Sequence, residues 1–389
     1  MSDDDPRPTL QARSIASIHH VPEDAWNACA GTDNPFVGHD FLSCLEDSNS
    51  ATPETGWAPA HILLEQEDGR LIGCAPAYYK SHSYGEFVFD HGWADAFERA
   101  GGRYYPKLLV AVPFTPATGP RLLVPPGPDA EEHRRLLAAT IIGVAQEAGI
   151  STAHVNFALE PEWRLMGEMG FLQRTGVQFH WVNEGFADFE AFLATLASRK
   201  RKAIRKERRE ALENGIEIET LSGADLTRDV WDSFFAFYRD TGSRKWGTPY
   251  LTRRFFDLLG ERMGDRVALV MARREGRWIA GALNLIGADT LYGRYWGCIE
   301  DHRHLHFECC YYQAIDYAIA HGLARVEAGA QGSHKIQRGY MPVHTYSAHW
   351  IGHDGFREAV KRFLDEESRH VDWEVEAIER EYSPFRKTE

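Results

Sequence analysis

Two stretches of this chain occur twice, and this internal repetition limits its fold more than any other feature of the sequence. The segment DGRLIGCA at 68–75 resembles EGRWIAGA at 275–282. Further along, residues 170–181 resemble residues 339–350, because both begin with glycine and an aromatic residue and end in His-Trp. The two pairs keep the same order, with a predicted helix and a predicted strand between them in each half. The sequence therefore predicts a duplicated domain.

The two copies differ in length. The repeated glycines lie 101 residues apart in the first copy, from Gly69 to Gly170, and 63 residues apart in the second, from Gly276 to Gly339. We expect most of the additional residues of the first copy between 82 and 130.

A chain of 389 residues is long enough to bury two cores. We therefore predict a first domain at 1–185 and a second domain at 186–389, which carries the site. The periodicity of apolar residues predicts a mixed α/β fold. The predicted elements include a hairpin at 60–80, helices at 130–148, 187–213 and 307–321, and strands at 172–182 and 325–330.

Charge is distributed unevenly along the chain. The formal net charge is -14, but residues 199–209 (RKRKAIRKERR) carry a local charge of +7. Within this predicted helix Arg201, Arg205 and Arg208 share one face, where like charges repel unless they are neutralised. Acidic groups of the same chain could neutralise them. The alternative is an anionic ligand, such as a diphosphate or the acceptor stem of a tRNA.

The composition indicates a globular, cytoplasmic protein. No apolar run approaches the length of a membrane helix, so we expect no membrane insertion. The N-terminus is acidic and polar, unlike a secretory signal. None of the six cysteines forms a C-x-x-C pair, and neither a zinc ribbon nor a disulfide framework is indicated.

Two glutamates are candidate general bases. On the strand predicted at 325–330, Glu327 and Gln331 point away from the face of Val326, next to a glycine-rich exit. Glu308 begins a predicted helix on its apolar stripe. Amide formation needs a base that takes a proton from the attacking amine, and Glu327 or Glu308 could serve. The structural alternatives are that Glu308 caps its helix and that Glu327 pairs with a nearby cation.

The loop QGSHKIQRG at 331–339 is a candidate ligand site. Glycines and cations together can bind phosphate or stabilise the oxyanion of a tetrahedral intermediate. The candidate donors are His334, Lys335, Arg338 and the following Tyr340, while Gln331 is a candidate substrate contact. A surface loop with solvated charges is the alternative.

A metal site is not predicted. His302, His304, His306 and Glu308 alternate in DHRHLHFE, and on a strand they would line one face. The helix predicted from about residue 307 breaks this alternation. We predict neither a metal nor another cofactor.

Several segments resemble the FemAB-like family of peptidoglycan biosynthesis or recognition proteins. These are FTPATGPRLL at 114–123, the basic helix from Arg199, GRYWG at 293–297, HFECCYYQ at 306–313 and EAGAQGSHK at 327–335. The resemblance implies tandem domains of the GNAT acyltransferase fold and amide-forming acyl transfer. It further implies that the donor can be an aminoacyl-tRNA. Substrate contacts are then expected at Thr115, Arg121, Arg294, Tyr295, Arg201 and Arg205.

Acetyl-CoA-dependent GNAT enzymes carry a pyrophosphate loop of the type R/Q-x-x-G-x-G/A before their central helix. The matching stretch here, residues 298–306, contains no glycine, so the close backbone approach to pyrophosphate is lost. We therefore predict an N-acyltransferase that joins an acyl or aminoacyl group to an amine, on a cell-envelope precursor or another small, phosphorylated acceptor. The alternatives are an acyl-CoA-dependent acetyltransferase and a non-catalytic protein that recognises glycan or peptide.

Overall fold

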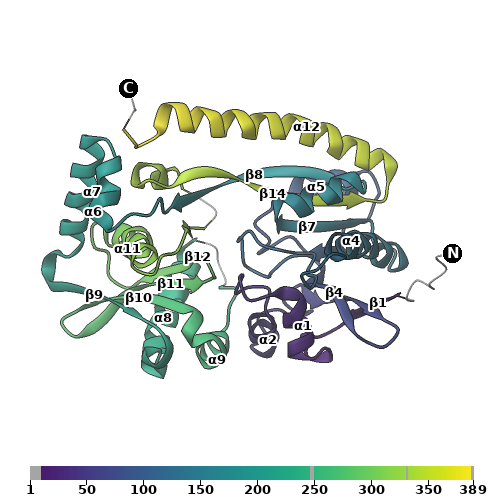
Figure 1. Ribbon diagram of the computed structural model, residues 1–389, viewed down its shortest axis with the longest axis horizontal. Helices are drawn as coiled ribbons and strands as arrows, with labels where there is room; N and C mark the ends of the chain where they lie inside the picture. The colour runs from purple at the N-terminus through teal and green to yellow at the C-terminus, as the bar shows by residue number, and fades with distance from the viewer. Residues whose placement is uncertain (1–9, 246–248, 330–331, 387–389) are drawn as a thin grey trace. The chain divides into compact units, whose positions relative to one another are not determined.

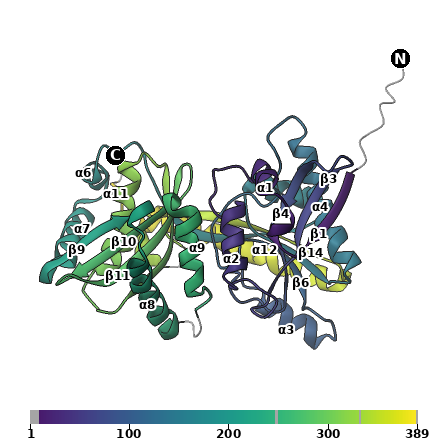
Figure 2. The same cartoon turned by 90° about the horizontal axis from the view of Figure 1, so that it is seen from below.

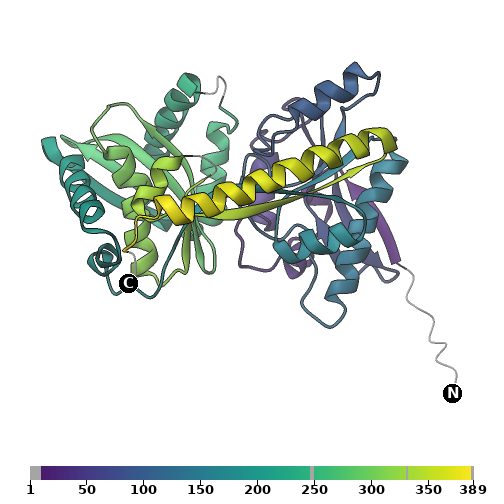
Figure 3. The same cartoon turned by 90° about the horizontal axis from the view of Figure 1, so that it is seen from above.

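The computed structural model of the protein describes residues 10–245, 249–329 and 332–386. The chain divides into two compact units. Unit 1 comprises Met1–Thr175 and Tyr346–Glu367, and unit 2 comprises Gly176–Thr345 and Ser368–Glu389. Two long strands, β8 (Leu172–Val182) and β14 (Met341–Ile351), and the helix α12 (Asp354–Ala377) have residues in both units (Figures 1 and 3).

Unit 1 contains two sheets. A small sheet has the order β1 (Leu10–Ile15), β3 (His61–Gln66) and β4 (Leu71–Ala75). The larger one has the order β2 (Trp57–Pro59), β5 (Ala77–Lys80), β6 (Lys107–Val110), β7 (Thr152–Ala158) and the end of β14. The helices are α1 (Glu23–Ala30), α2 (His39–Asp47), α3 (His91–Arg99), α4 (Ala130–Glu147) and α5 (Glu160–Glu168). One face of α4 packs into the main core of this unit through Leu137 and Ile141.

Unit 2 contains one run of strands. Its order is the end of β8, β13 (Arg325–Glu327), β12 (Thr290–Cys298), β11 (Arg277–Ile286), β10 (Val267–Arg274) and β9 (Ile216–Leu221). The helices are α6 (Phe189–Thr195), α7 (Ser198–Ala211), α8 (Arg228–Lys245), α9 (Arg253–Met263), α10 (Leu305–Phe307) and α11 (Gln313–Ala320). Helices α8 and α9 lie on one side of β10 and β11 (Figure 2), and α11 packs on the other face through Ile315.

The two units repeat one topology. In unit 1 the parallel strands β6 and β7 are joined through α4, and in unit 2 the parallel strands β12 and β13 are joined through α10 and α11. The strand β11 pairs with both of its neighbours, β10 and β12. In unit 1 Pro76 splits the equivalent strand into β4, which pairs with β3, and β5, which pairs with β6. The predicted mixed α/β fold of tandem GNAT-like domains is confirmed.

The last strands of the two copies are exchanged. The end of β8 follows the first copy but pairs antiparallel with β13 of unit 2. The end of β14 follows the second copy but pairs antiparallel with β7 of unit 1. The segments 170–181 and 339–350 thus form the same element, a long strand that begins just after a glycine with positive φ. The additional residues of the first copy lie at 81–106 and 111–129. The domain limits 1–185 and 186–389 stay a prediction.

The prediction of a single helix at 187–213 is wrong. Two helices, α6 and α7, are separated at Leu196 and Ala197, whose ψ angles of 155° and 142° are not helical. Leu196 is fully buried and forms a β-bridge with Phe385, while the Ala197 N–H donates to the carbonyl of Pro384. Tertiary contacts with the C-terminal segment therefore override the helical pattern.

Two further elements differ from expectation in detail. The helix predicted at 307–321 begins earlier, at Leu305, and contains a π-helical turn at Glu308–Tyr312. The strand predicted at 325–330 is β13, which ends at Glu327. In the described part of the chain, no helix combines the length and apolarity needed to cross a bilayer.

Candidate functional site

Glu327 is the middle residue of a row of three residues on neighbouring strands of unit 2. It pairs directly with Tyr292 of β12 on one side and with His180 of β8 on the other. Its neighbour Val326 packs with Ile315 in the core beneath α11. Because side chains alternate along a strand, the Glu327 carboxylate lies on the opposite face of the sheet from α11.

The surroundings of Glu327 are buried. Its Oε2 lies 3.8 Å from His180 Nε2, and its Oε1 lies 4.0 Å from the Nε atom of Arg325. Burial, together with the charges of Arg325 and Lys335, lowers the pKa of His180 to about 3, so its imidazole is neutral at pH 7. Burial and the adjacent Glu327 raise the pKa of Tyr292. Glu327 therefore has an uncharged polar side chain beside it on each neighbouring strand.

Glu308 lies on the other face of the sheet, with the helices. Arg208 of α7 donates from Nη2 to Oε1 at 2.9 Å and from Nε to both carboxylate oxygens at 3.2 Å, and Gln313 donates to Oε1 at 2.8 Å. Burial raises the pKa of Glu308, and the charge of Arg208 opposes this. Since Glu308 and Glu327 lie on opposite faces, the two candidate bases are not brought together.

The loop after β13 contributes one buried amine. Lys335 is 1% exposed, and its Nζ donates to the Gly329 carbonyl at 2.8 Å. Burial lowers the pKa of Lys335 to about 8. Because its charge also acts on His180, Lys335 lies within electrostatic range of the row that contains Glu327.

The other loop residues gather around the π-helical turn. The exposed His334 hydrogen-bonds the Tyr311 hydroxyl at 2.8 Å, and the Tyr340 hydroxyl donates to the Tyr311 carbonyl at 3.2 Å. Arg338 stacks 3.5 Å over the Phe307 ring and donates to Glu207 at 2.8 Å. This is a packed, largely internal group. Gln331 lies outside the described residues.

Four other predicted contacts lie elsewhere. In β12, the Arg294 guanidinium lies 5.3 Å from the Tyr295 ring centroid, and Tyr295 packs on Tyr238 of α8. In unit 1, the Thr115 hydroxyl donates to the Pro113 carbonyl. Arg121 is 1% exposed, and its guanidinium donates to three backbone carbonyls, including Asn156 at 2.9 Å. Thr115 and Arg121 therefore organise a loop of unit 1.

The three arginines on α7 have different environments. Arg201 is half-buried, and its Nη1 lies within reach of the carbonyls of Ala194 and Leu196. Arg205 is exposed and pairs with Glu190. Arg208 turns inward to Glu308 and also to Asp316 at 2.6 Å. Acidic side chains thus neutralise two of the three charges, while Arg201 and Arg205 still reach solvent.

This difference predicts unequal effects of two otherwise identical substitutions. Arg208→Gln should lower the free energy of unfolding by about 1–3 kcal/mol, because the buried Glu308 loses charged hydrogen bonds. Arg205→Gln should leave the midpoint of urea denaturation unchanged, because its ion pair is exposed to solvent. Equal midpoints for the two variants would contradict the inward pairing of Arg208.

The loop 298–306 is closed by ion pairs among its own and neighbouring residues. Glu300 binds Arg274 at 2.9 Å and His302 at 2.9 Å. His304 has a positive φ and faces Glu210 instead, at 3.3 Å. The two histidines therefore turn to different carboxylates, which is not the single face that a metal would need.

Unit 1 has an equivalent of the Glu327 row. In the matching strand register His154 of β7 takes the place of Glu327, and its pairing partner His349 of β14 takes the place of His180. The Nδ1 atoms of His154 and His349 lie 2.7 Å apart. Sequence reasoning missed His180 as a site residue, although the repeated His-Trp that ends each copy was the signal.

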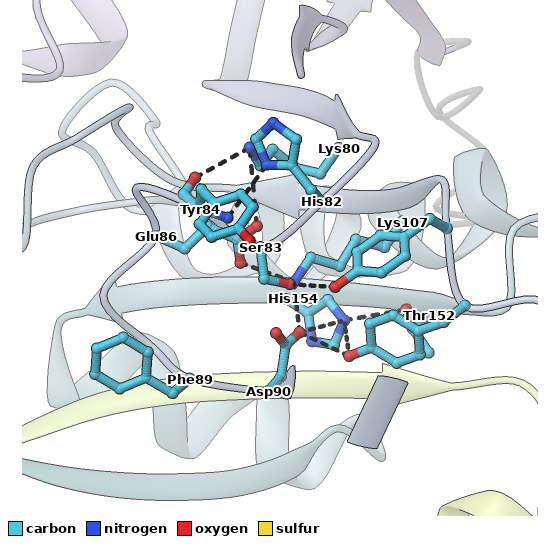
Figure 4. Close-up of polar contacts among 12 residues, drawn as sticks. Lys80, His82, Ser83, Tyr84, Glu86, Phe89, Asp90, Lys107, Thr152 and His154 are labelled. Carbon is cyan, nitrogen blue, oxygen red and sulfur yellow. Dashed lines mark hydrogen bonds and ion pairs between the residues drawn. The ribbon is translucent and has the colours of Figure 1, made fainter. Parts of the chain in front are cut away.

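Segment 81–106, an addition to the first copy, binds beside this equivalent row (Figure 4). Its Asp90 accepts from the Tyr104 hydroxyl at 2.7 Å, and that hydroxyl lies 3.3 Å from His154 Nε2. Lys107 of β6 donates to Glu86 of the same segment at 2.8 Å and pairs with Asp90. The row of unit 1 is therefore embedded in a buried ionic network.

Solved structures with the same fold include the following three. FemX superposes with a TM-score of 0.55 at 12% identity, over 90% of this chain and 100% of its own. The C-terminal domain of a putative lysylphosphatidylglycerol synthetase from Agrobacterium fabrum gives 0.55 at 10% identity, over 90% and 97%. L-PGS from Bacillus licheniformis gives 0.51 at 10% identity, over 86% and 98%.

Sequence comparison identifies the family. No curated protein matches the chain. The model of the FemAB-like family, described as peptidoglycan biosynthesis/recognition, matches residues 17–387. This match spans both units and all the segments on which the resemblance rests, and the chain belongs to the FemAB-like family.

Proposed function

We propose that this protein is an N-acyltransferase that joins an activated acyl or aminoacyl group to an amine of a peptidoglycan precursor. Membership of the FemAB-like family over residues 17–387 is the observation that carries this proposal. The tandem GNAT-like fold supports it, because GNAT domains are acyltransferase domains.

The proposed base is Glu327. During amide formation the amine nitrogen attacks the acyl carbon, the carbonyl π electrons move to oxygen, and the nitrogen loses a proton. Glu327 accepts that proton, and the leaving group departs when the oxyanion collapses. Its position supports this role better than that of Glu308, whose two oxygens both accept hydrogen bonds from Arg208.

Lys335 is the proposed electrostatic partner. A cation near the acyl oxygen stabilises the tetrahedral oxyanion, and a buried site strengthens the interaction. Lys335 is buried, lies on the loop that follows Glu327 and acts electrostatically on His180. Arg338 and Tyr340 are held by internal partners, so we assign them to the support of this loop.

Membership of the same family also supports a choice of donor and acceptor. We propose an aminoacyl-tRNA as the donor and a phosphorylated peptidoglycan precursor as the acceptor. Arg201 and Arg205 on α7 are available for phosphate contacts, since both reach solvent. The loop 298–306 lacks glycine and is closed by the Glu300 ion pairs, which argues against acetyl-CoA as the donor.

Mass spectrometry of reaction products tests this function. The purified chain is incubated with UDP-linked muramyl peptide and either a mixture of aminoacyl-tRNAs or acetyl-CoA. We expect an acceptor mass increased by one aminoacyl residue in the first mixture only. An acetylated product, or micromolar acetyl-CoA binding with one site per chain by calorimetry, would instead establish the acyl-CoA-dependent enzyme. Acceptor binding with no product from either donor would establish a recognition protein.

A further inference from the structure

The first turns of α1 and α2 in unit 1 bring three metal-ligating side chains together. Glu23 begins α1, and His39 and Asp40 begin α2. Asn27, one turn after Glu23, accepts a hydrogen bond from the His39 backbone N–H at 3.0 Å, which holds the two helices side by side (Figures 1 and 2). One ligand atom from each of Glu23, His39 and Asp40 lies within 4.8 Å of the other two.

The imidazole of His39 supplies independent evidence for a ligand. His39 is 8% exposed. The Nε2 atom of its ring is shielded from solvent and has no hydrogen-bond partner. A buried nitrogen without a partner costs free energy, so natural structures rarely leave one.

We propose that Glu23, His39 and Asp40 bind one divalent transition-metal cation of the Zn²⁺ class. Two carboxylates balance the charge of the ion, and one imidazole nitrogen favours a transition metal over Mg²⁺ or Ca²⁺, which prefer oxygen ligands only. Bonds of about 2.1 Å place two ligands of one ion at most about 4 Å apart. The ligand atoms now lie within 4.8 Å of one another, and a change of rotamer at the exposed Glu23 can bring them to the shorter separation.

The proposed ion would link α1 to α2, which are already joined by the hydrogen bond from the His39 N–H to Asn27. Both helices belong to unit 1 and the Glu327 row belongs to unit 2, so the proposal does not depend on the acyltransferase function.

Calorimetry on the full chain, freed of metal with a chelator, tests the site. Titration with Zn²⁺ should show one ion per chain, and metal analysis after dialysis should give the same ratio. Cobalt(II) bound at the same ratio should show the visible absorption of a low-symmetry site. The bound ion should also raise the melting temperature, because it binds only the folded protein.

Two variants remove one ligand each. Loss of a residue that only hydrogen-bonds a metal ligand typically weakens metal binding by roughly 10- to 100-fold. His39→Ala removes a ligand itself, so it should weaken Zn²⁺ binding by more than this. Since His39 is buried, Glu23→Gln provides a second test on an exposed residue, and it should weaken binding while the apo protein keeps its melting temperature.

Matched controls use the neighbouring residues. His19, whose ring lies 6.0 Å from that of His39 but whose Nε2 pairs with Asp47, is replaced in His19→Ala. Asp24, whose carboxylate accepts from the Ala25 N–H, is replaced in Asp24→Asn. Both should bind Zn²⁺ as the wild type does. Failure of the wild type to bind one ion, equal affinity of wild type and Glu23→Gln, or Mg²⁺ binding of similar strength would overturn the proposal.

Discussion

Glu327→Gln is expected to lower the turnover of acyl transfer by about 100- to 10,000-fold, the usual cost of losing a general base. Glutamine keeps the shape of the side chain and removes its proton-accepting charge. The flanking His180 and Tyr292 can still contact an amide, because their contacts with Glu327 do not depend on two full charges. We therefore expect a folded but nearly inactive protein.

Glu308→Gln is the matched control for this experiment. Glu308 is as buried as Glu327 but lies on the other face of the sheet, where it pairs with Arg208. Its replacement should lower the melting temperature and leave turnover per folded molecule near that of the wild type. Turnover and melting temperature are measured on the same samples. A reversed pattern, with activity lost in Glu308→Gln and kept in Glu327→Gln, would sink the assignment of Glu327.

His180 belongs to the same row as Glu327. Its neutral imidazole lies 3.8 Å from Glu327, so it would position the carboxylate without exchanging the proton itself.

The repeat in the sequence predicted that the two His-Trp segments occupy one kind of element, and the strands β8 and β14 agree with this. It could not predict that each strand pairs in the other unit, because strand exchange leaves no trace in local periodicity.

Within the candidate site, the sequence predicted features that depend on local alternation and missed those that depend on long-range contacts. The alternation of residues around Val326 correctly turned Glu327 away from the helix core. Nothing local indicated that Arg208 would leave the solvent face of its helix to bind Glu308, or that Arg121 would donate to backbone carbonyls. Long-range pairing decided both, and charged residues far apart in the sequence give no periodic signal.

The ionic network of unit 1 leads to the second large effect. Lys107 is fully buried, and its ammonium donates to Ser83 at 2.7 Å and to Glu86 at 2.8 Å and pairs with Asp90 (Figure 4). All three partners belong to the segment 81–106, which the second copy lacks. One ammonium on β6 thus holds the added segment to the sheet. Lys80 is also buried in this unit, but its Nζ lies 4.0 Å from Glu86 and cannot replace Lys107 at that distance.

Lys107→Met should lower the free energy of unfolding by about 3–5 kcal/mol, because it leaves Glu86 and Asp90 buried without their shared cation. Methionine fills a similar volume, so lost packing contributes little. Lys206→Met is the control, since Lys206 is exposed and lies 3.5 Å from Glu210 in a surface pair. Urea denaturation gives the stability of both variants, and hydrogen exchange locates the change. Faster exchange should concentrate in 81–106, because that segment loses its anchor. Loss of stability no greater than in Lys206→Met, or exchange that increases evenly over both units, would show that Lys107 does not anchor the segment.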